Sequence, residues 1–68
     1  MNREQAQQAA ATFQAAGWDV VAQQSPLDGH DYELAGRAAN GDCDDKFYGF
    51  SHNDMKTLVL GGQIKRKT

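Results

Sequence analysis

Residues that could bind a metal or catalyse a reaction gather in three clusters of aspartate, histidine and cysteine. The clusters are Asp28, His30 and Asp31; Asp42, Cys43, Asp44 and Asp45; and His52 and Asp54. A set of one cysteine, two histidines and an aspartate can hold zinc. However, no C-x-x-C or H-x-x-x-H spacing is present, and the glycine and distal glutamate of a calcium loop are missing. Aspartate and asparagine favour polar turns, so we expect turns here and neither a metal nor a cofactor.

Nucleophilic catalysis would need Cys43, the only cysteine, with His30 or His52 as its base. The three aspartates around Cys43 disfavour the reactive thiolate, so we expect no enzymatic activity. A single cysteine also excludes an internal disulfide, which fits a reducing compartment. The start "MNREQAQQ" is not that of a secretory signal, and no apolar run reaches seven residues. The expected location is therefore the cytoplasm, away from membranes.

The aromatic stretch "KFYGF" is the best candidate for binding. In an alternating strand, Phe47 and Gly49 share one face while Tyr48 and Phe50 share the other. If Phe47 joins the core, Tyr48 and Phe50 face away from it, and aromatic anchors with a charged rim are typical of protein interfaces. The alternative is that Tyr48 or Phe50 is the buried ring. The predicted binding residues are Tyr48, Phe50, Asp42, Asp44 and Asp45.

Charge disfavours nucleic acid as the partner. The formal net charge is −2, and between Asp28 and Asp54 seven acids face two bases. Three of the seven bases of the chain lie in the tail Lys65 to Lys67. The body of the chain therefore lacks the basic footprint of a nucleic-acid-binding domain. A module that binds nucleic acid through this tail and the "KFYGF" strand stays the alternative.

The elements that would position these residues begin with a helix from about Arg3 to Ala16. Ala6, Ala9, Ala10 and Phe13 have the spacing of one helical face. Asn2 and Gln5 form a capping box, and Gly17 ends the helix. Strands are predicted near 18–24, 31–37 and 46–51 from their alternating patterns and from the turn signals between them. Ala11 and Ala15 lie off the core face, where the helix could pair with a second copy.

The last twenty residues allow two interpretations. Gly61-Gly62 could turn a hairpin, which would place one helix on a sheet of four or five strands. Alternatively, Ser51 and Asp54 start a helix over 52–60 that these glycines end. Met55, Leu58 and Val59 have the spacing of a buried helical face, so the helix is favoured. Residues 64–68 then form a basic tail with freedom to move.

Two families resemble parts of this sequence. "GFSHNDMKTLVLGG" resembles the segment of GYF-type adaptor domains in which a strand runs through a phenylalanine-serine pair into a capped helix. The aromatic and tryptophan positions that form the peptide pocket of that family have no counterpart upstream, so no binding residue is transferred. The order helix, three strands, helix is similar to that of double-stranded RNA-binding domains. Where those carry a lysine cluster, this chain has His52, Asn53 and Asp54, which repel phosphate.

The sequence thus predicts one α+β domain over residues 1–68, with a three-stranded antiparallel sheet between two helices in the chain order. The expected core contains Ala9, Ala10, Phe13, Trp18, Val20, Leu34, Phe47, Met55, Leu58 and Val59. The expected function is a non-enzymatic protein-protein interaction module. Short chains without catalytic residues are the kind that phages and mobile elements use to inhibit host or defence proteins, and acidic clusters suit a partner that normally holds nucleic acid.

Overall fold

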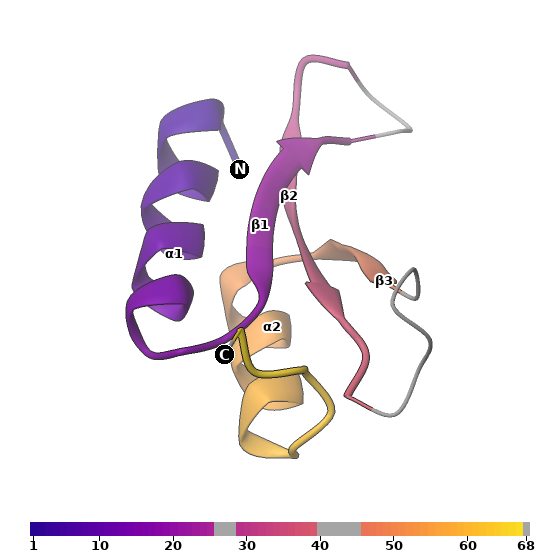
Figure 1. The fold of residues 1–68 in the computed structure, drawn as a ribbon. Coiled ribbons are helices and arrows are strands. Elements are labelled where there is room, and N and C mark those ends of the chain that lie inside the picture. The colour runs from indigo at the N-terminus through magenta and orange to yellow at the C-terminus, as the bar shows by residue number, and fades with distance from the viewer. Residues whose placement is uncertain (26–28, 40–45, 68) are drawn as a thin grey trace.

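The computed structural model describes residues 1–25, 29–39 and 46–67, which form two helices and one antiparallel sheet (Figure 1). The elements are α1 (Arg3–Ala15), β1 (Val20–Gln24), β2 (Tyr32–Arg37), β3 (Lys46–Phe50) and α2 (His52–Leu60). This order confirms the predicted α+β fold, arranged as one small compact domain. In the described ranges, no helix has the length and apolar character needed to cross a membrane.

Local signals at both ends define α1. The Asn2 side chain accepts the Gln5 N–H at 2.8 Å, and the Gln5 side chain accepts the Asn2 N–H at 3.1 Å, which completes the predicted capping box. At the other end, Gly17 takes a φ of 94°. The Trp18 N–H then donates to the Phe13 carbonyl at 3.0 Å, which adds a hydrogen bond at the last turn of the helix.

Similar local hydrogen bonds define both ends of α2. The Ser51 hydroxyl accepts the Asp54 N–H at 3.2 Å at the start of α2. At its end, Gly62 has a φ of 73°, and the Gln63 N–H donates to the Leu58 carbonyl at 3.0 Å. Gly61-Gly62 therefore ends a helix, and the hairpin alternative is wrong.

The sheet has the order β1-β2-β3, and a bulge shapes its last strand. Leu34 pairs with Phe50 and Gly36 with Phe47, so β3 contains one residue more than β2 between the same two pairs. Gly49 takes a φ of 76° at this irregularity, as a glycine in a bulge often does. The extra residue breaks the alternation of side chains along β3, and this affects where Phe47 and Phe50 point.

We call residues Gln63 to Lys67 the C-terminal segment. It runs between the residues that precede β1 and the end of β2. The Asp19 N–H donates to the Lys65 carbonyl at 2.9 Å, and the Lys65 N–H donates to the Arg37 carbonyl at 2.8 Å. Trp18 and Arg66 form one antiparallel bridge, and Ala38 and Ile64 form another. Where we expected a basic tail, backbone pairing holds the segment on both sides. Trp18 and Asp19 pair with this segment, so β1 begins at Val20 and not at residue 18.

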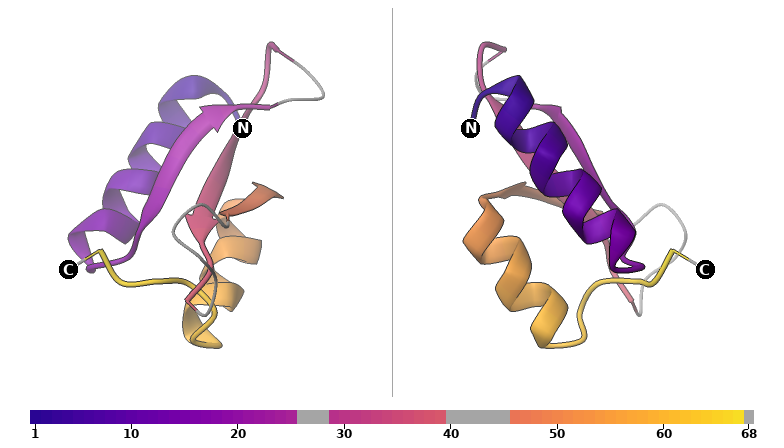
Figure 2. Two further views of the ribbon diagram at one scale, coloured as in Figure 1. Left: turned by 45° about the vertical axis from the view of Figure 1, so that its right-hand side comes forward. Right: turned by 90° about the vertical axis from the view of Figure 1, so that its left-hand side faces the viewer.

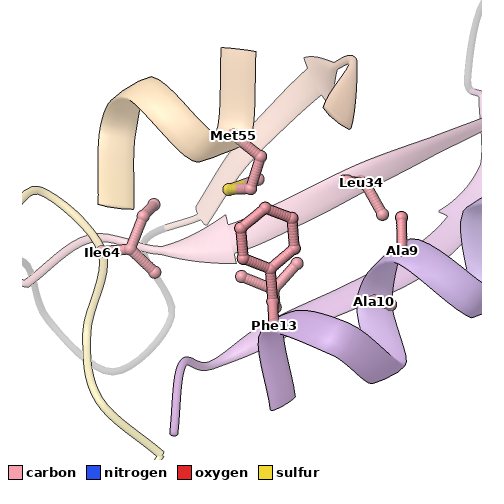
Figure 3. Packing of buried hydrophobic residues seen from close by; sticks show 7 residues of the cluster. Ala9, Ala10, Phe13, Leu34, Met55 and Ile64 are labelled. Carbon is pink, nitrogen blue, oxygen red and sulfur yellow. The ribbon is translucent and has the colours of Figure 1, made fainter. Parts of the chain in front are cut away.

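Both helices cover the same face of the sheet, and the core lies between them and the strands (Figure 2). Phe13 of α1 and Met55 of α2 point toward each other, with Leu34 of β2 on one side of them and Ile64 on the other (Figure 3). Leu34 and Met55 are fully buried, and Ile64 is 2% exposed. The C-terminal segment thus contributes one of the largest buried side chains.

The predicted core is confirmed at most of its positions, and three further buried residues were not on the predicted list. Predicted core residues that are buried are Ala9, Ala10, Phe13, Val20, Leu34 and Met55. Those that are partly buried against it are Trp18, Phe47, Leu58 and Val59. Ile64 and Ala6 are buried without having been predicted, as is Ala35 on the sheet face that turns away from the helices.

Candidate functional site

A recess of about 310 Å³ opens where β2 begins and β3 ends. Its walls come from the N-terminus, the start and middle of β2, and the bulged end of β3. The lining residues are Met1, Ser25, Asp31, Tyr32, Glu33, Gly49, Phe50 and Ser51. We call this the acidic recess, because Asp31 and Glu33 both contribute to its lining.

Strand geometry places the two carboxylates together. Asp31 and Glu33 are two residues apart in extended chain, so their side chains leave the same face of the sheet. The Ser25 N–H donates to the Asp31 carbonyl at 2.9 Å, which extends the β1–β2 pairing as far as this residue. Asp31 is exposed, whereas Glu33 is only 7% exposed. The recess therefore has one carboxylate at its rim and one buried in its wall.

The Glu33 carboxylate is held by the bulge in β3. Its Oε2 atom accepts a hydrogen bond from the Gly49 N–H. A bulge leaves the extra residue of a strand unpaired in the ladder, and here a side chain of the neighbouring strand accepts its amide. Glu33 thus links the two strands that form the recess, which fixes the shape of its wall.

The N-terminal ammonium of Met1 occupies the rim. It donates to the Asp31 carboxylate at 2.9 Å and to the Tyr32 carbonyl at 3.2 Å. The Tyr32 N–H donates in return to the Met1 carbonyl at 2.8 Å. The ammonium lowers the pKa of Asp31 by its hydrogen bond, and the Tyr32 N–H, which donates to the same carboxylate at 3.0 Å, lowers it further.

Phe50 does not lie where alternation placed it. Its ring packs edge-to-face against Phe47, with ring centroids 5.9 Å apart, and both rings pack on the core. The expectation that Phe47 and Phe50 occupy opposite faces is therefore wrong, because the bulge at Gly49 shifts Phe50 onto the side of Phe47. Phe50 is half-buried and still lines the acidic recess.

The other predicted binding residues cannot be placed with respect to the recess. Asp42, Asp44 and Asp45 lie outside the described residues, and so does the side chain of Tyr48. Their role in binding stays a prediction. Cys43 and Asp28 also lie outside the described ranges, so the expectation that they take no part in catalysis or zinc binding stays a prediction. Across residues 1–25, 29–39 and 46–67, no three His, Cys, Asp or Glu side chains gather as metal ligands would.

The hollow between the helices is a second feature. His52, the first residue of α2, sets its ring edge-to-face on Phe13 at 5.3 Å between centroids. Beside it, a shallow depression of about 270 Å³ is lined by Gln5, Gln8, Ala9, Thr12 and His52. These side chains are uncharged amides, hydroxyls and methyl groups around one imidazole. They offer little that would select a ligand by charge.

The basic residues of the C-terminal segment lie near the C-terminal end of α1, away from the acidic recess at its N-terminal end. The Arg66 guanidinium stacks over the Trp18 ring, 4.5 Å from its centroid, and Lys65, Arg66 and Lys67 are all exposed. Asp19 pairs with Arg37 at 3.5 Å nearby. Arg66 lies beside Gly17, just beyond the end of α1. Because α1 has no basic residue in its last turn, the charge of Arg66 also suits the negative end of that helix dipole.

Compared with protein-family models, curated proteins and solved structures, the chain matches none of them. Its function must therefore be argued from its own residues. Sequence patterns pointed to Phe50 and to acidic residues as a binding surface. They did not indicate Glu33, because an alternating strand places a glutamate on the solvent side, and burial of Glu33 depends on a bulge in another strand.

Proposed function

We propose that this chain is a non-enzymatic module that binds a partner protein through the acidic recess. The observation that carries the proposal is the meeting of Phe50 with Asp31 and Glu33 around one hollow. Aromatic rings supply buried contact area at interfaces, and charges around them select the partner and speed association. Three segments distant in sequence build this surface, so its shape depends on the fold.

We further propose that the partner presents a basic surface of the kind that normally holds nucleic acid. A carboxylate-lined surface matches such a partner by charge. Inhibition of a host or defence protein by a small protein of a phage or mobile element is one setting in which this chemistry is used. The single cysteine supports a reducing compartment such as the cytoplasm as the place of action.

Paired charge-neutralising variants test the proposal. The partner is captured from a native host extract with the full chain, and its affinity is then measured at about 0.15 M salt for Asp31→Asn and Asp54→Asn. Both residues are exposed acids, but only Asp31 lines the recess. We expect Asp31→Asn to weaken binding several-fold and Asp54→Asn to leave it nearly unchanged.

Equal effects of Asp31→Asn and Asp54→Asn would contradict a role for the recess. Alanine at Phe50 is not a clean test, because that ring packs on the core and its loss would destabilise the fold. Circular dichroism and thermal unfolding of each variant show that the fold is intact before affinities are compared.

Binding of nucleic acid is the second candidate, and the exposed side chains of Lys65, Arg66 and Lys67 favour it. Stacking of bases on the "KFYGF" strand gains no support from Phe47 and Phe50, whose rings pack on the core. If the purified chain retains DNA or RNA at about 0.15 M salt and loses it steeply as salt rises, nucleic-acid binding replaces protein binding as the proposal.

A further inference from the structure

The geometry points to a lysine or arginine side chain of the partner as the group that enters the acidic recess, with Glu33 as its receiving carboxylate. This inference rests on the proposed function and names the chemistry of its partner. It is drawn from three features of the recess: the burial of Glu33, the ammonium already held at the rim, and the aromatic wall.

Burial of Glu33 is the first feature. A carboxylate has two oxygens that can accept several hydrogen bonds. Among the described residues, it has one donor, the Gly49 N–H on Oε2. Charged groups are rarely buried unless they are paired, because leaving water costs free energy that a single amide only partly offsets. With an exposed fraction of 7%, Glu33 is an acceptor for a cation that reaches into the hollow.

The rim shows that the recess suits an ammonium group. Asp31 and the Tyr32 carbonyl together hold the Met1 ammonium at 2.9 and 3.2 Å, with hydrogen bonds of ordinary length. Among the described lining residues, this ammonium is the one cation beside the Asp31 and Glu33 carboxylates. No lysine, arginine or histidine side chain is among the described lining residues to accompany Glu33, the more buried of the two acids.

The wall of the recess matches the rest of a basic side chain. Lysine and arginine carry an apolar stem that packs along apolar surface while the charged end reaches a polar partner. The half-buried Phe50, which lines the same recess as Glu33, supplies such a surface. Arginine gains a further contact by stacking on a ring. A neutral apolar side chain would use these walls but leave the carboxylate unpaired.

Titration of the isotope-labelled full chain with short peptides tests this inference by NMR. The probes are the blocked tripeptides Ala-Lys-Ala, Ala-Arg-Ala and Ala-Norleucine-Ala, and the reporter is the Gly49 amide, which donates to Glu33. We expect the lysine and arginine peptides to shift this amide in proportion to the fraction bound, so that the relative affinities of the probes can be compared. The norleucine peptide should bind at least fivefold more weakly.

Variants connect the signal to the carboxylate. Glu33→Gln keeps an acceptor for the Gly49 N–H but removes the charge, so it should lower the affinity for the lysine peptide at least fivefold. Asp54→Asn should change this affinity less than twofold. If Glu33→Gln does not fold, Asp31→Asn at the exposed rim and a rise in salt from 0.05 to 0.5 M should each weaken binding.

The inference fails if norleucine binds as well as lysine, or if folded Glu33→Gln binds lysine unchanged. In that case, partner capture that still depends on Asp31 would leave the proposed function standing. If partner capture did not depend on Asp31 either, the proposed function would fail as well.

Discussion

Gly36 shows how closely single residues are packed where β2, α2 and the C-terminal segment meet. A Cβ placed on Gly36 would lie 2.9 Å from Cδ1 of Ile64 and 3.2 Å from the sulfur of Met55. Both neighbours are buried, so neither has much room to move. The absence of a side chain at Gly36 lets Ile64 and Met55 approach the strand, which is a packing requirement and not one of backbone conformation.

Gly36→Ala should therefore lower the free energy of unfolding by about 1–3 kcal/mol, the usual penalty for overpacking a core. Gly29→Ala is the matched control, because nothing lies within 4 Å of its Cβ position, and it should change stability by no more than about 0.5 kcal/mol. Ile64→Val removes the Cδ1 atom and should partly rescue Gly36→Ala. Additive effects of Gly36→Ala and Ile64→Val in urea unfolding would contradict this packing.

Asp31 gives the chain a pH dependence at the rim of the recess. Its hydrogen bond from the Met1 ammonium lowers its pKa in the folded chain, whereas the unfolded chain has the ordinary value of about 4. A lowered folded pKa means that the pair stabilises the fold above about pH 4 and that this stabilisation is lost as the pH falls through the folded pKa. Salt should weaken the effect, because the carboxylate is exposed.

Denaturant unfolding of the wild type and Asp31→Asn at several pH values checks this. The wild type should be the more stable above pH 4, and the difference should shrink as Asp31 becomes protonated. A difference that stays constant from pH 6 to pH 2 would mean that the ammonium pair does not stabilise the fold.

The two helices are the elements that local sequence signals define best. Asn2 with Gln5, Ser51 with the Asp54 amide, and a left-handed glycine after each helix all lie within a few residues of the ends they fix. Such patterns act through neighbouring backbone groups, so they could be predicted without knowledge of the rest of the fold. The bounds of α2 were predicted correctly for this reason.

Gly62→Ala should lower the free energy of unfolding by about 1–2 kcal/mol, because alanine is strained at the φ of 73° that ends α2. Gly61→Ala is the control, since Gly61 has a φ of −79° that alanine adopts readily. It should change stability by no more than about 0.5 kcal/mol. A hairpin turn of the glycine-glycine kind would need a positive φ at both residues, so equal losses in thermal unfolding would contradict the helix end.

Features that depend on contacts between distant elements could not be predicted. The bulge at Gly49 is defined by the register between β2 and β3, and a strand pattern read alone assigned Phe50 to the wrong face. Burial of Glu33 follows from the same bulge. The sequence thus indicated an aromatic and acidic binding surface, while the residues that form the recess became visible only when two strands were placed side by side.

At the scale of the whole molecule, the C-terminal segment closes the fold. It connects the end of α2 back to the start of β1 and the end of β2 (Figure 2). The segment carries Ile64 into the core and leaves Lys65, Arg66 and Lys67 exposed near the end of α1. Met1, at the rim of the acidic recess, lies at the other end of this helix, whose thirteen residues span about 20 Å. The N-terminus, at the recess, and the C-terminus, beside the basic residues, thus lie near opposite ends of α1 (Figure 1).

Ile64→Ala tests whether the segment is part of the fold. It should lower the free energy of unfolding by about 2–5 kcal/mol, because Ile64 is 2% exposed in the core. Leu60→Ala is the control, since Leu60 is 80% exposed and should change stability by no more than about 0.5 kcal/mol. Hydrogen exchange gives an independent readout: the Asp19 and Lys65 amides, which bond to and from this segment, should be protected. Fast exchange of both would show that the segment is a free tail.

Mapping of the bound partner on the isotope-labelled chain by NMR tests the central claim most directly. If the acidic recess is the binding surface, the amides of Tyr32, Glu33, Gly49 and Ser51 should shift most on addition of the captured partner protein, and those of Trp18 and Lys65 to Lys67 should stay in place. A footprint confined to Trp18 and the C-terminal segment would contradict the account.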